Sequence, residues 1–250
     1  MRLHGTTLEV SATDLSNFLG CRHRTARDMA VAWKQRPRPP KFTDPLLELL
    51  WKRGLEHEKC YVDSLKADGH AITDLSGIDS RESQDELLAA TLEAMRSGAQ
   101  VIVQGALHDG CWFGKPDVLS RVDRCGDLGG WSYEVIDTKL ARETRAGTIL
   151  QLGLYSEMLG LVQGVRPEHF HVVTPDKDSP KHTFRLDDFA AYLRLIRKQM
   201  LAIVALDPDA VAQTYYPVPV DPCGTCRWDR DCDEKRHEDD DLSLVAGISR

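Results

Sequence analysis

The sequence predicts an α/β fold with an α-helical N-terminal elaboration and a C-terminal cysteine knot. Three observations predict this fold. Apolar residues at helical spacing dominate the first hundred residues, and three strand-like runs follow them. A helix, a fourth strand and a long amphipathic helix then complete the pattern. This order of elements indicates one α/β core preceded by helices.

The N-terminal part is expected to be helical. Ser11, followed three residues later by Asp14, resembles a capping box and opens a helix that carries Cys21. The next segment, "RPRPPKFTDP", is a loop because its prolines cannot sustain a helix. Helical spacing of apolar residues then predicts helices over 43–67 and 82–97.

The central part changes to strand character. The runs "VIVQGAL", "CWFGKPDVLSRV" and "WSYEVIDTK" are separated by the turn residues "HDG" and "RCGDLGG", which predicts a meander of three strands. "GTILQLGLYSEMLGLV" is then a helix, "HFHVVTP" a fourth strand and "LDDFAAYLRLIRKQMLAIVAL" a long amphipathic helix. The segment "YYPVPVDPCGTCRWDRDC" is rich in proline and cysteine and is expected to be irregular.

These patterns divide the chain into four parts. Residues 1–42 hold the N-terminal helix, a basic loop and the first cysteine, and residues 43–213 hold the core. Residues 214–236 form the cysteine-rich segment, and residues 237–250 have the composition of an acidic linker or tail. A linker at this end leaves open whether the chain is one module of a longer protein.

The composition is that of a globular protein, with 42% hydrophobic and 28% charged residues. No apolar run approaches the length of a membrane span and no signal pattern opens the chain, so we expect a cytoplasmic protein without a membrane partner. The net charge of −7 taken alone disfavours a nucleic-acid partner. The segment 21–41 is nevertheless strongly basic, and it predicts either a local positive surface or a solvated helix face.

Two aspartates fall within strand-like apolar runs. Asp137 shares a strand face with Lys139, and Asp117 lies on the preceding strand of the meander, so the two carboxylates can converge. Close carboxylates repel and burial makes them costlier, whereas a divalent cation removes both problems. Hard oxygen ligands favour Mg²⁺ or Mn²⁺, and Lys139 could serve a metal-activated water and the charge growing on a phosphate. The alternative is that both aspartates simply end strands next to turns.

Four short motifs carry a resemblance to a nuclease family. "KPD" at 115–117 and "DTK" at 137–139 look like the signature of the PD-(D/E)XK nucleases. "QLGLY" resembles the Q-x-x-x-Y motif of the RecB-like branch, because Gln151 and Tyr155 share one helix face. "RGLEHE" places His57 three residues after Gly54, where RecB-like nucleases have a metal-binding histidine. A core histidine and a polar pair at a helix edge are the alternatives for these last two motifs.

The resemblance implies a restriction-endonuclease-like core, in which a mixed sheet is flanked by helices. It assigns the catalytic metal to His57, Asp117, Asp137 and the main-chain carbonyl of Thr138. It also implies that Lys139 serves the attacking water, and that Gln151 and Tyr155 support the site and the DNA backbone. The second acid is aspartate rather than glutamate, which the family pattern tolerates and which shortens the ligand arm by one methylene.

The cysteines point to a second metal centre. Seven cysteines, an odd number without a secretory signal, favour metal over disulfides. Three of them, Cys223, Cys226 and Cys232, follow a C-x2-C-x5-C pattern, and both zinc and iron–sulfur sites normally need a fourth ligand. The residues alone leave that fourth ligand open among Cys21, Cys60, Cys111 and Cys125.

The resemblance selects Cys21. Some RecB-like nucleases, among them AddAB-type helicase–nucleases and CRISPR-associated exonucleases, carry one cysteine before the core and three after it, and these hold a [4Fe–4S] cluster. "FLGCRHR" looks like the segment of that leading cysteine. The cluster would clasp the N-terminal helix to the C-terminal knot and stabilise the fold, with zinc as the alternative.

The sequence therefore predicts a metal-dependent DNA nuclease, expected by resemblance to be an exonuclease acting on single-stranded ends or flaps. Arg22, Arg24 and Arg27 would form a basic rim that guides the DNA strand. The resemblance leaves repair, CRISPR adaptation and defence open as the pathway, with a helicase, CRISPR or defence protein as partner. The alternatives are a structure-specific endonuclease and a non-catalytic DNA-binding or docking module of a larger helicase–nuclease.

Overall fold

A computed structural model describes residues 1–40, 44–176 and 180–246. The chain divides into two compact units. The sheet unit is Pro45–Leu195, and the terminal unit combines Met1–Asp44 with Ile196–Arg250. The sequence analysis placed the end of the core at residue 213, but the division falls inside helix α6 (Leu186–Val204). The predicted α/β class is confirmed, because the sheet unit builds a mixed sheet between helices.

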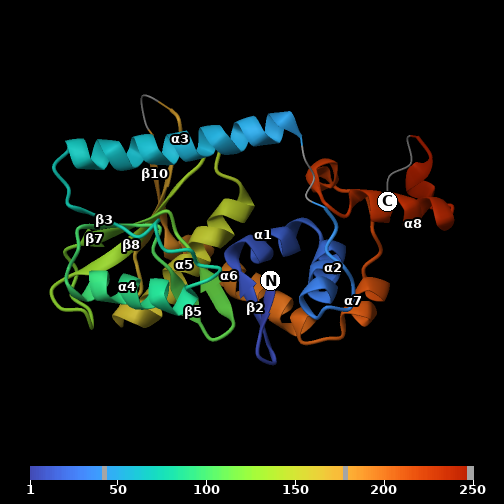
Figure 1. The fold of residues 1–250 in the computed structure, drawn as a ribbon, viewed down its shortest axis with the longest axis horizontal. Coiled ribbons are helices and arrows are strands. Elements are labelled where there is room, and N and C mark those ends of the chain that lie inside the picture. The colour runs from blue at the N-terminus through green and yellow to red at the C-terminus, as the bar shows by residue number, and fades with distance from the viewer. Residues whose placement is uncertain (41–43, 177–179, 247–250) are drawn as a thin grey trace. The chain divides into compact units, whose positions relative to one another are not determined.

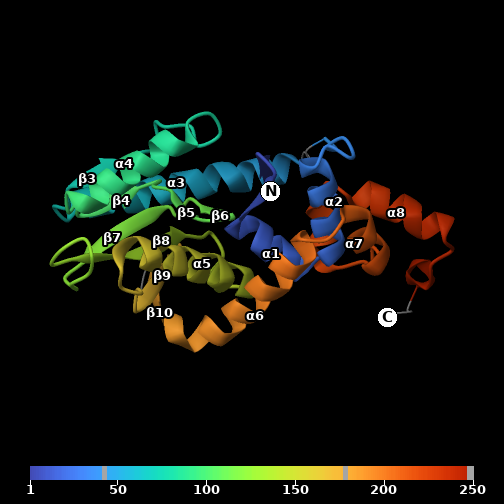
Figure 2. The same ribbon diagram turned by 90° about the horizontal axis from the view of Figure 1, so that it is seen from below.

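The sheet unit contains a six-stranded sheet in the order β10-β9-β8-β7-β4-β3, whose strands can be followed in Figures 1 and 2. Its strands are β3 (Ile72–Asp74), β4 (Val101–Val103), β7 (Val118–Val122), β8 (Ser132–Thr138), β9 (His169–Val173) and β10 (Lys181–Arg185). The pairs β3–β4 and β8–β9 are parallel, and the other neighbours are antiparallel. The sheet is therefore mixed.

The predicted meander is present with one correction. β4, β7 and β8 are antiparallel neighbours, as expected. The middle run, however, is not one strand, because β6 (Trp112–Gly114) ends before Lys115 and pairs with β5 (Leu107–Asp109) in a hairpin. Pro116 lacks the N–H that a continuous ladder would need, so the chain leaves one hairpin and starts β7 at Val118.

Helices cover both faces of this sheet. α3 (Pro45–Ala67) lies on one face, and α4 (Gln84–Arg96) and α5 (Ala146–Gln163) lie on the other (Figure 1). Figure 2 shows α5 running beside β8 and β9, which it contacts. The predicted bounds of α3 and α4 were correct to within two residues at each end.

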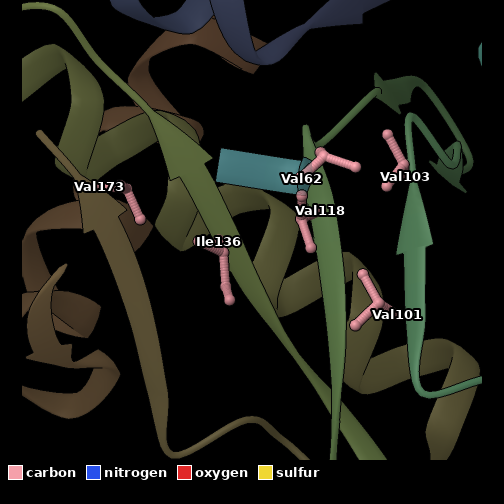
Figure 3. Close-up of a cluster of buried hydrophobic side chains, with 6 residues drawn as sticks. All are labelled: Val62, Val101, Val103, Val118, Ile136 and Val173. Carbon is pink, nitrogen blue, oxygen red and sulfur yellow. The ribbon is translucent and has the colours of Figure 1, made fainter. Parts of the chain in front are cut away.

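The α3 face of the sheet forms an aliphatic cluster. Val62 of α3 packs on side chains from four strands, as Figure 3 shows. The members from the sheet are Val101, Val103, Val118, Ile136 and Val173. Because strand side chains alternate between faces, this cluster fixes which residues of β7 and β8 point away from α3.

The terminal unit begins with a hairpin of β1 (Arg2–His4) and β2 (Thr7–Ser11), which the sequence analysis missed. The capping box is present: Asp14 N–H donates to Ser11 Oγ at 3.2 Å, and Ser11 N–H donates to Asp14 Oδ2 at 2.8 Å. The prediction of one helix through Cys21 was wrong. α1 (Ala12–Gly20) and α2 (Arg22–Ala32) are separate helices, and Cys21 between them has an extended backbone.

The C-terminal segments of this unit are more regular than predicted. α7 (Pro208–Thr214) lies beside α2 (Figures 1 and 2). The 3₁₀ turn η1 (Asp221–Thr225) leads to α8 (Asp229–Glu238), and η2 (Leu242–Leu244) follows. The expected irregular knot thus ends in a helix that carries Cys232, and the expected acidic tail begins inside that helix.

Replacing Val118 by alanine tests the packing that fixes the register of β7. Val118 is fully buried in the cluster, so losing two methyl groups there should lower the free energy of unfolding by about 1–3 kcal/mol. The control is Leu161→Ala, because Leu161 is 67% exposed on α5 and its loss should cost less than about 0.5 kcal/mol. Denaturant unfolding measures both values. Equal losses would contradict the role given to the cluster.

Candidate functional site

The register of β7 and β8 brings two aspartates together. Val118 pairs with Ile136, so the next position outward sets Asp117 opposite Asp137. Their carboxyl groups interact directly. The sequence analysis expected these two residues to converge from neighbouring strands. In the structure Asp117 comes just before β7 begins at Val118, so it faces Asp137 by continuing the β7–β8 register and does not lie within the strand.

Asp137 sits in an environment that opposes its charge. The residue is 1% exposed, and burial together with the Asp117 carboxylate raises its pKa to about 7, against the favourable charge of Lys139. Lys139 Nζ forms an ion pair with Asp137 Oδ2, although the contact lacks hydrogen-bond geometry. Among the described residues, none donates a hydrogen bond to this buried oxygen. The Lys139 ammonium group is therefore the contact of this buried oxygen, and a cation bound by the acid pair would share the oxygen with Lys139 or displace it.

Thr138 fixes the second acid. Its N–H and its hydroxyl both donate to Asp117 Oδ2, at 2.8 and 3.0 Å. Gln104 holds the backbone at the same point, because its N–H donates to the carbonyl of Asp117 at 2.8 Å. Gln104 has a φ of 56°, a conformation that a non-glycine residue rarely adopts. These contacts keep the Asp117 carboxylate against Asp137.

Helix α3 contributes His57 at the β9 side of the site. The carbonyl of Val173, the strand partner of Thr138, accepts from Lys139 N–H at 2.9 Å and lies 3.2 Å from His57 Nε2. A carbonyl oxygen only accepts, so this contact places the imidazole proton on Nε2. Nδ1 is then the nitrogen with a lone pair, which is the form in which histidine binds metals.

The next residue of α3, Glu58, was missed by the sequence analysis. Its carboxylate accepts a hydrogen bond from Gln104 Nε2, and its pKa is raised by burial and then by the charge of Asp117. Glu58 is therefore a third carboxylate near the acid pair, on the β4–β7 side. The available signal was its place directly after His57: adjacent residues on a helix point about 100° apart, so both can reach a site that the helix crosses.

Buried Tyr155 and half-buried Gln151 form a hydrogen-bonded pair on α5. Gln151 Nε2 donates to the Tyr155 hydroxyl at 3.1 Å, and burial raises the pKa of that hydroxyl above its usual range. The Tyr155 ring packs on Gly114, where a Cβ atom would lie 2.6 Å from two ring carbons. Only glycine fits there. The tyrosine thus supports the chain just before Asp117.

These residues fit a hard divalent cation in part. Among the residues that the structure describes, no three histidine, cysteine or acidic side chains already stand as a metal-binding group. The acid pair itself has the right chemistry, because its two carboxylates offer hard oxygen ligands, although Oδ2 of Asp137 already contacts the Lys139 ammonium group. A cation would also remove the repulsion that raises the pKa of Asp137.

In the terminal unit, four cysteines surround one small cavity. Cys21, Cys223, Cys226 and Cys232 line a space of about 60 Å³ beside Trp228. The nearness of the thiols shows in the pKa of Cys232, which burial, and then the charges of Cys226 and Cys21, raise to about 12. Four thiols that line one cavity have the chemistry of a thiolate-bound metal site, although in the described residues they do not already stand as a metal-binding group.

Local structure explains why Cys21 joins the other three. The break between α1 and α2 turns its side chain into a helix cap, and Arg24 N–H donates to Cys21 Sγ at 3.4 Å. Val220 N–H donates to Cys223 Sγ at the same distance. The competing cysteines, Cys60, Cys111 and Cys125, all lie in the sheet unit.

The three arginines expected to form a basic rim do not share one exposed surface. Arg22 is exposed and stacks over the rings of Phe18 and Tyr215, each 5.5 Å from its guanidinium carbon. Arg24 lines the cysteine cavity, and Arg27 Nε donates to His23 at 3.0 Å. Both are half-buried because α2 packs against other elements of this unit. Arg22 is the member of the three that can meet a ligand in this arrangement.

No protein-family model and no curated protein matches this chain, so the functional argument rests on its own residues and geometry. None of the helices built from the described residues combines the length and apolar character needed to cross a bilayer.

The acid pair predicts that Asp137→Asn removes a loss of folding stability that the wild type undergoes as the pH rises. A folded-state pKa near 7 against 3.8 in the unfolded chain means that the native state binds the extra proton. Its contribution to stability is present below pH 4 and is lost as the pH rises to 7. At pH 8 without divalent metal, the asparagine variant should therefore be more stable than the wild type by about 2–4 kcal/mol.

Thermal unfolding in chelator between pH 4 and 8 measures this difference. Asp123→Asn is the matched control, since Asp123 is exposed in the turn after β7 and should keep the wild-type profile. Added Mg²⁺ at pH 8 should stabilise the wild type and leave Asp137→Asn unchanged. Parallel profiles for wild type and Asp137→Asn would show that the carboxylates do not interact.

Proposed function

We propose that the chain is a metal-dependent nuclease of restriction-endonuclease-like architecture that hydrolyses DNA phosphodiester bonds. The observation that carries the proposal is the meeting of half-buried Asp117 with buried Asp137 at the end of the β7–β8 pair, with Lys139 in contact. A folded chain does not gain from placing two carboxylates together unless a cation or a proton separates them. An exonuclease acting on single-stranded ends or flaps is the activity that the motif resemblance favours.

In this proposal Asp117 and Asp137 hold the cation, together with the Thr138 carbonyl and His57 Nδ1. Mg²⁺ or Mn²⁺ bound there would polarise the phosphate and lower the pKa of a water molecule. Lys139 supplies an ammonium group beside Asp137, which can orient that water and stabilise charge on the phosphate oxygens. The Thr138 hydroxyl and N–H keep Asp117 oriented throughout.

Glu58 has a supporting place in this site. Burial raises its pKa, and the charge of Asp117 raises that pKa further, so Glu58 is close enough to Asp117 to influence the same cation. Its hydrogen bond to Gln104 links it to the residue whose N–H holds the Asp117 backbone. We propose Glu58 as a carboxylate that can accept a hydrogen bond from a metal-bound water.

We further propose that Cys21, Cys223, Cys226 and Cys232 hold a [4Fe–4S] cluster. The terminal unit is assembled from two segments that are distant in the sequence, Met1–Asp44 and Ile196–Arg250. Cys21 belongs to the first segment and the other three cysteines to the second. A bound cluster would cross-link the two segments and so reduce the entropy of the unfolded chain.

A nuclease assay tests the main proposal. The wild type, with Mg²⁺ or Mn²⁺, should cleave single-stranded, flapped or duplex DNA, and Asp117→Ala and Lys139→Ala should each lower kcat by at least about 100-fold. DNA binding should persist in both variants. The matched controls, Asp123→Ala and Lys198→Ala, remove the same charges from exposed positions and should cleave like the wild type.

The same assay separates the modes of action. Short products from end-labelled linear DNA with an intact closed circle would indicate an exonuclease, and cutting of the circle an endonuclease. Wild-type rates in both Asp117→Ala and Lys139→Ala would refute the assigned site. DNA binding by the wild type without any cleavage would instead favour a docking module.

The cysteine proposal predicts a coloured protein. Anaerobically purified wild type should be brown with broad visible absorbance, and its iron and sulfide contents should be equal. Cys21→Ser should lose the colour and unfold at a lower temperature, whereas Cys125→Ser changes an exposed cysteine and should do neither. A colourless wild type with stoichiometric zinc would replace the cluster by a zinc site and leave the nuclease proposal standing.

A further inference from the structure

A groove of about 450 Å³ opens beside the acid pair in the sheet unit. Its walls come from the α3 residues around Glu58, from the segment after β3, from the end of β4 and from Lys115. Glu58 and Gln104 line the groove and also contact the surroundings of Asp117. The groove therefore shares Glu58 and Gln104 with the surroundings of the candidate site, and its size suits a ligand of one or two rings.

Two cations in this groove have no fixed partner. Within the part of the chain that the structure describes, the Nζ atoms of Lys59 and Lys115 form neither a hydrogen bond nor an ion pair. The third lysine, Lys66, differs, because it pairs with Asp63 at 3.5 Å. Neither ammonium group is held by an ion pair, although the charge of Lys115 acts on two carboxylates that line the same groove, so both lysines can turn to a phosphate group that enters it.

The remaining walls suit a nucleoside. Leu55, which is 48% exposed, offers aliphatic surface against which a flat base can pack, and the largely buried Val62 and Val103 also line the groove. Asp74, whose pKa is lowered by hydrogen bonds from Ser76, stays ionised and can accept a hydrogen bond from a base amino or sugar hydroxyl group. Because the groove contains a carboxylate as well as lysines, it accepts a single phosphate more readily than a run of phosphates.

We propose that this groove binds the terminal nucleotide of a single DNA strand, with Lys115 and Lys59 on its phosphate and the base against Leu55 and Val62. The inference rests on the proposed nuclease function. Lys115 precedes Asp117 by two residues, so a phosphate held there lies next to the acid pair. Lys115 is then a positioning residue that presents the bond adjoining the strand end for hydrolysis, which makes the enzyme an exonuclease.

Nucleotide binding tests the groove without relying on cleavage. Calorimetric titration of the full chain with deoxyadenosine 5′- and 3′-monophosphate should show binding of at least one of them. Deoxyadenosine and inorganic phosphate, each carrying half of the ligand, should bind more weakly. Lys115→Gln and Lys59→Gln should each weaken nucleotide binding about 10-fold, because a charge-assisted hydrogen bond is lost. Lys52→Gln is the matched control, since it removes the same charge from an exposed position of α3 outside the groove.

Steady-state kinetics give the second readout. Lys115→Gln should raise KM for single-stranded DNA about 10-fold with little change in kcat, as expected for a residue that positions substrate. Ser76→Trp should fill the groove and block both the nucleotide and the strand end. Absent nucleotide binding, or equal binding by Lys115→Gln and Lys52→Gln, overturns the groove assignment even if DNA is cleaved. Nucleotide binding that depends on Lys115 in a chain that cleaves no DNA retains the groove and removes the nuclease function.

Discussion

The repulsion between two carboxylates on adjacent strands is the constraint on which the site depends. Asp137 is almost completely buried and faces Asp117, so the pair is stable as two anions only when a cation lies between them. The surrounding contacts reduce the cost without removing it: Thr138 donates twice to Asp117, and Lys139 pairs with Asp137. Because repulsion between the two carboxylates destabilises the protein without a cation, binding of a cation that removes this repulsion is favoured.

Packing of the core determines where Asp117 and Asp137 lie. The same alternation of strand side chains allows their positions to be predicted from the sequence. Val118 and Ile136 lie in the aliphatic cluster under α3, and the alternation of strand side chains then assigns Asp117 and Asp137 to a common position across the pair. A shift of the β7–β8 register by one residue would expose the aliphatic cluster. The packing that stabilises the fold therefore also fixes the positions of the two aspartates. Period-two alternation is visible in one strand's sequence, which is why this part of the site could be predicted.

Other features depend on contacts that no local pattern encodes. Helical periodicity did not predict Glu58, because it marks the residues that pack on the core and Glu58 lies at the edge of that face. The break at Cys21 follows Gly20, a residue common at helix ends, but the capping box upstream suggested a longer helix. β1, β3 and β10 are short or alternate polar residues, so their pairing partners decide their structure.

Helix α3 connects the core, the acid pair and the groove through consecutive turns. Val62 packs on the sheet, His57 contacts the β9 side, Glu58 contacts the β4–β7 side, and Leu55 and Lys59 face the groove. These side chains leave one rigid helix in different directions, so their spacing around the site is fixed by the burial of Val62. A ligand in the groove therefore meets a wall whose position is set by the same packing that sets the register of β7 and β8. Burial of the apolar face thus sets the position of the groove wall and of the acid pair together.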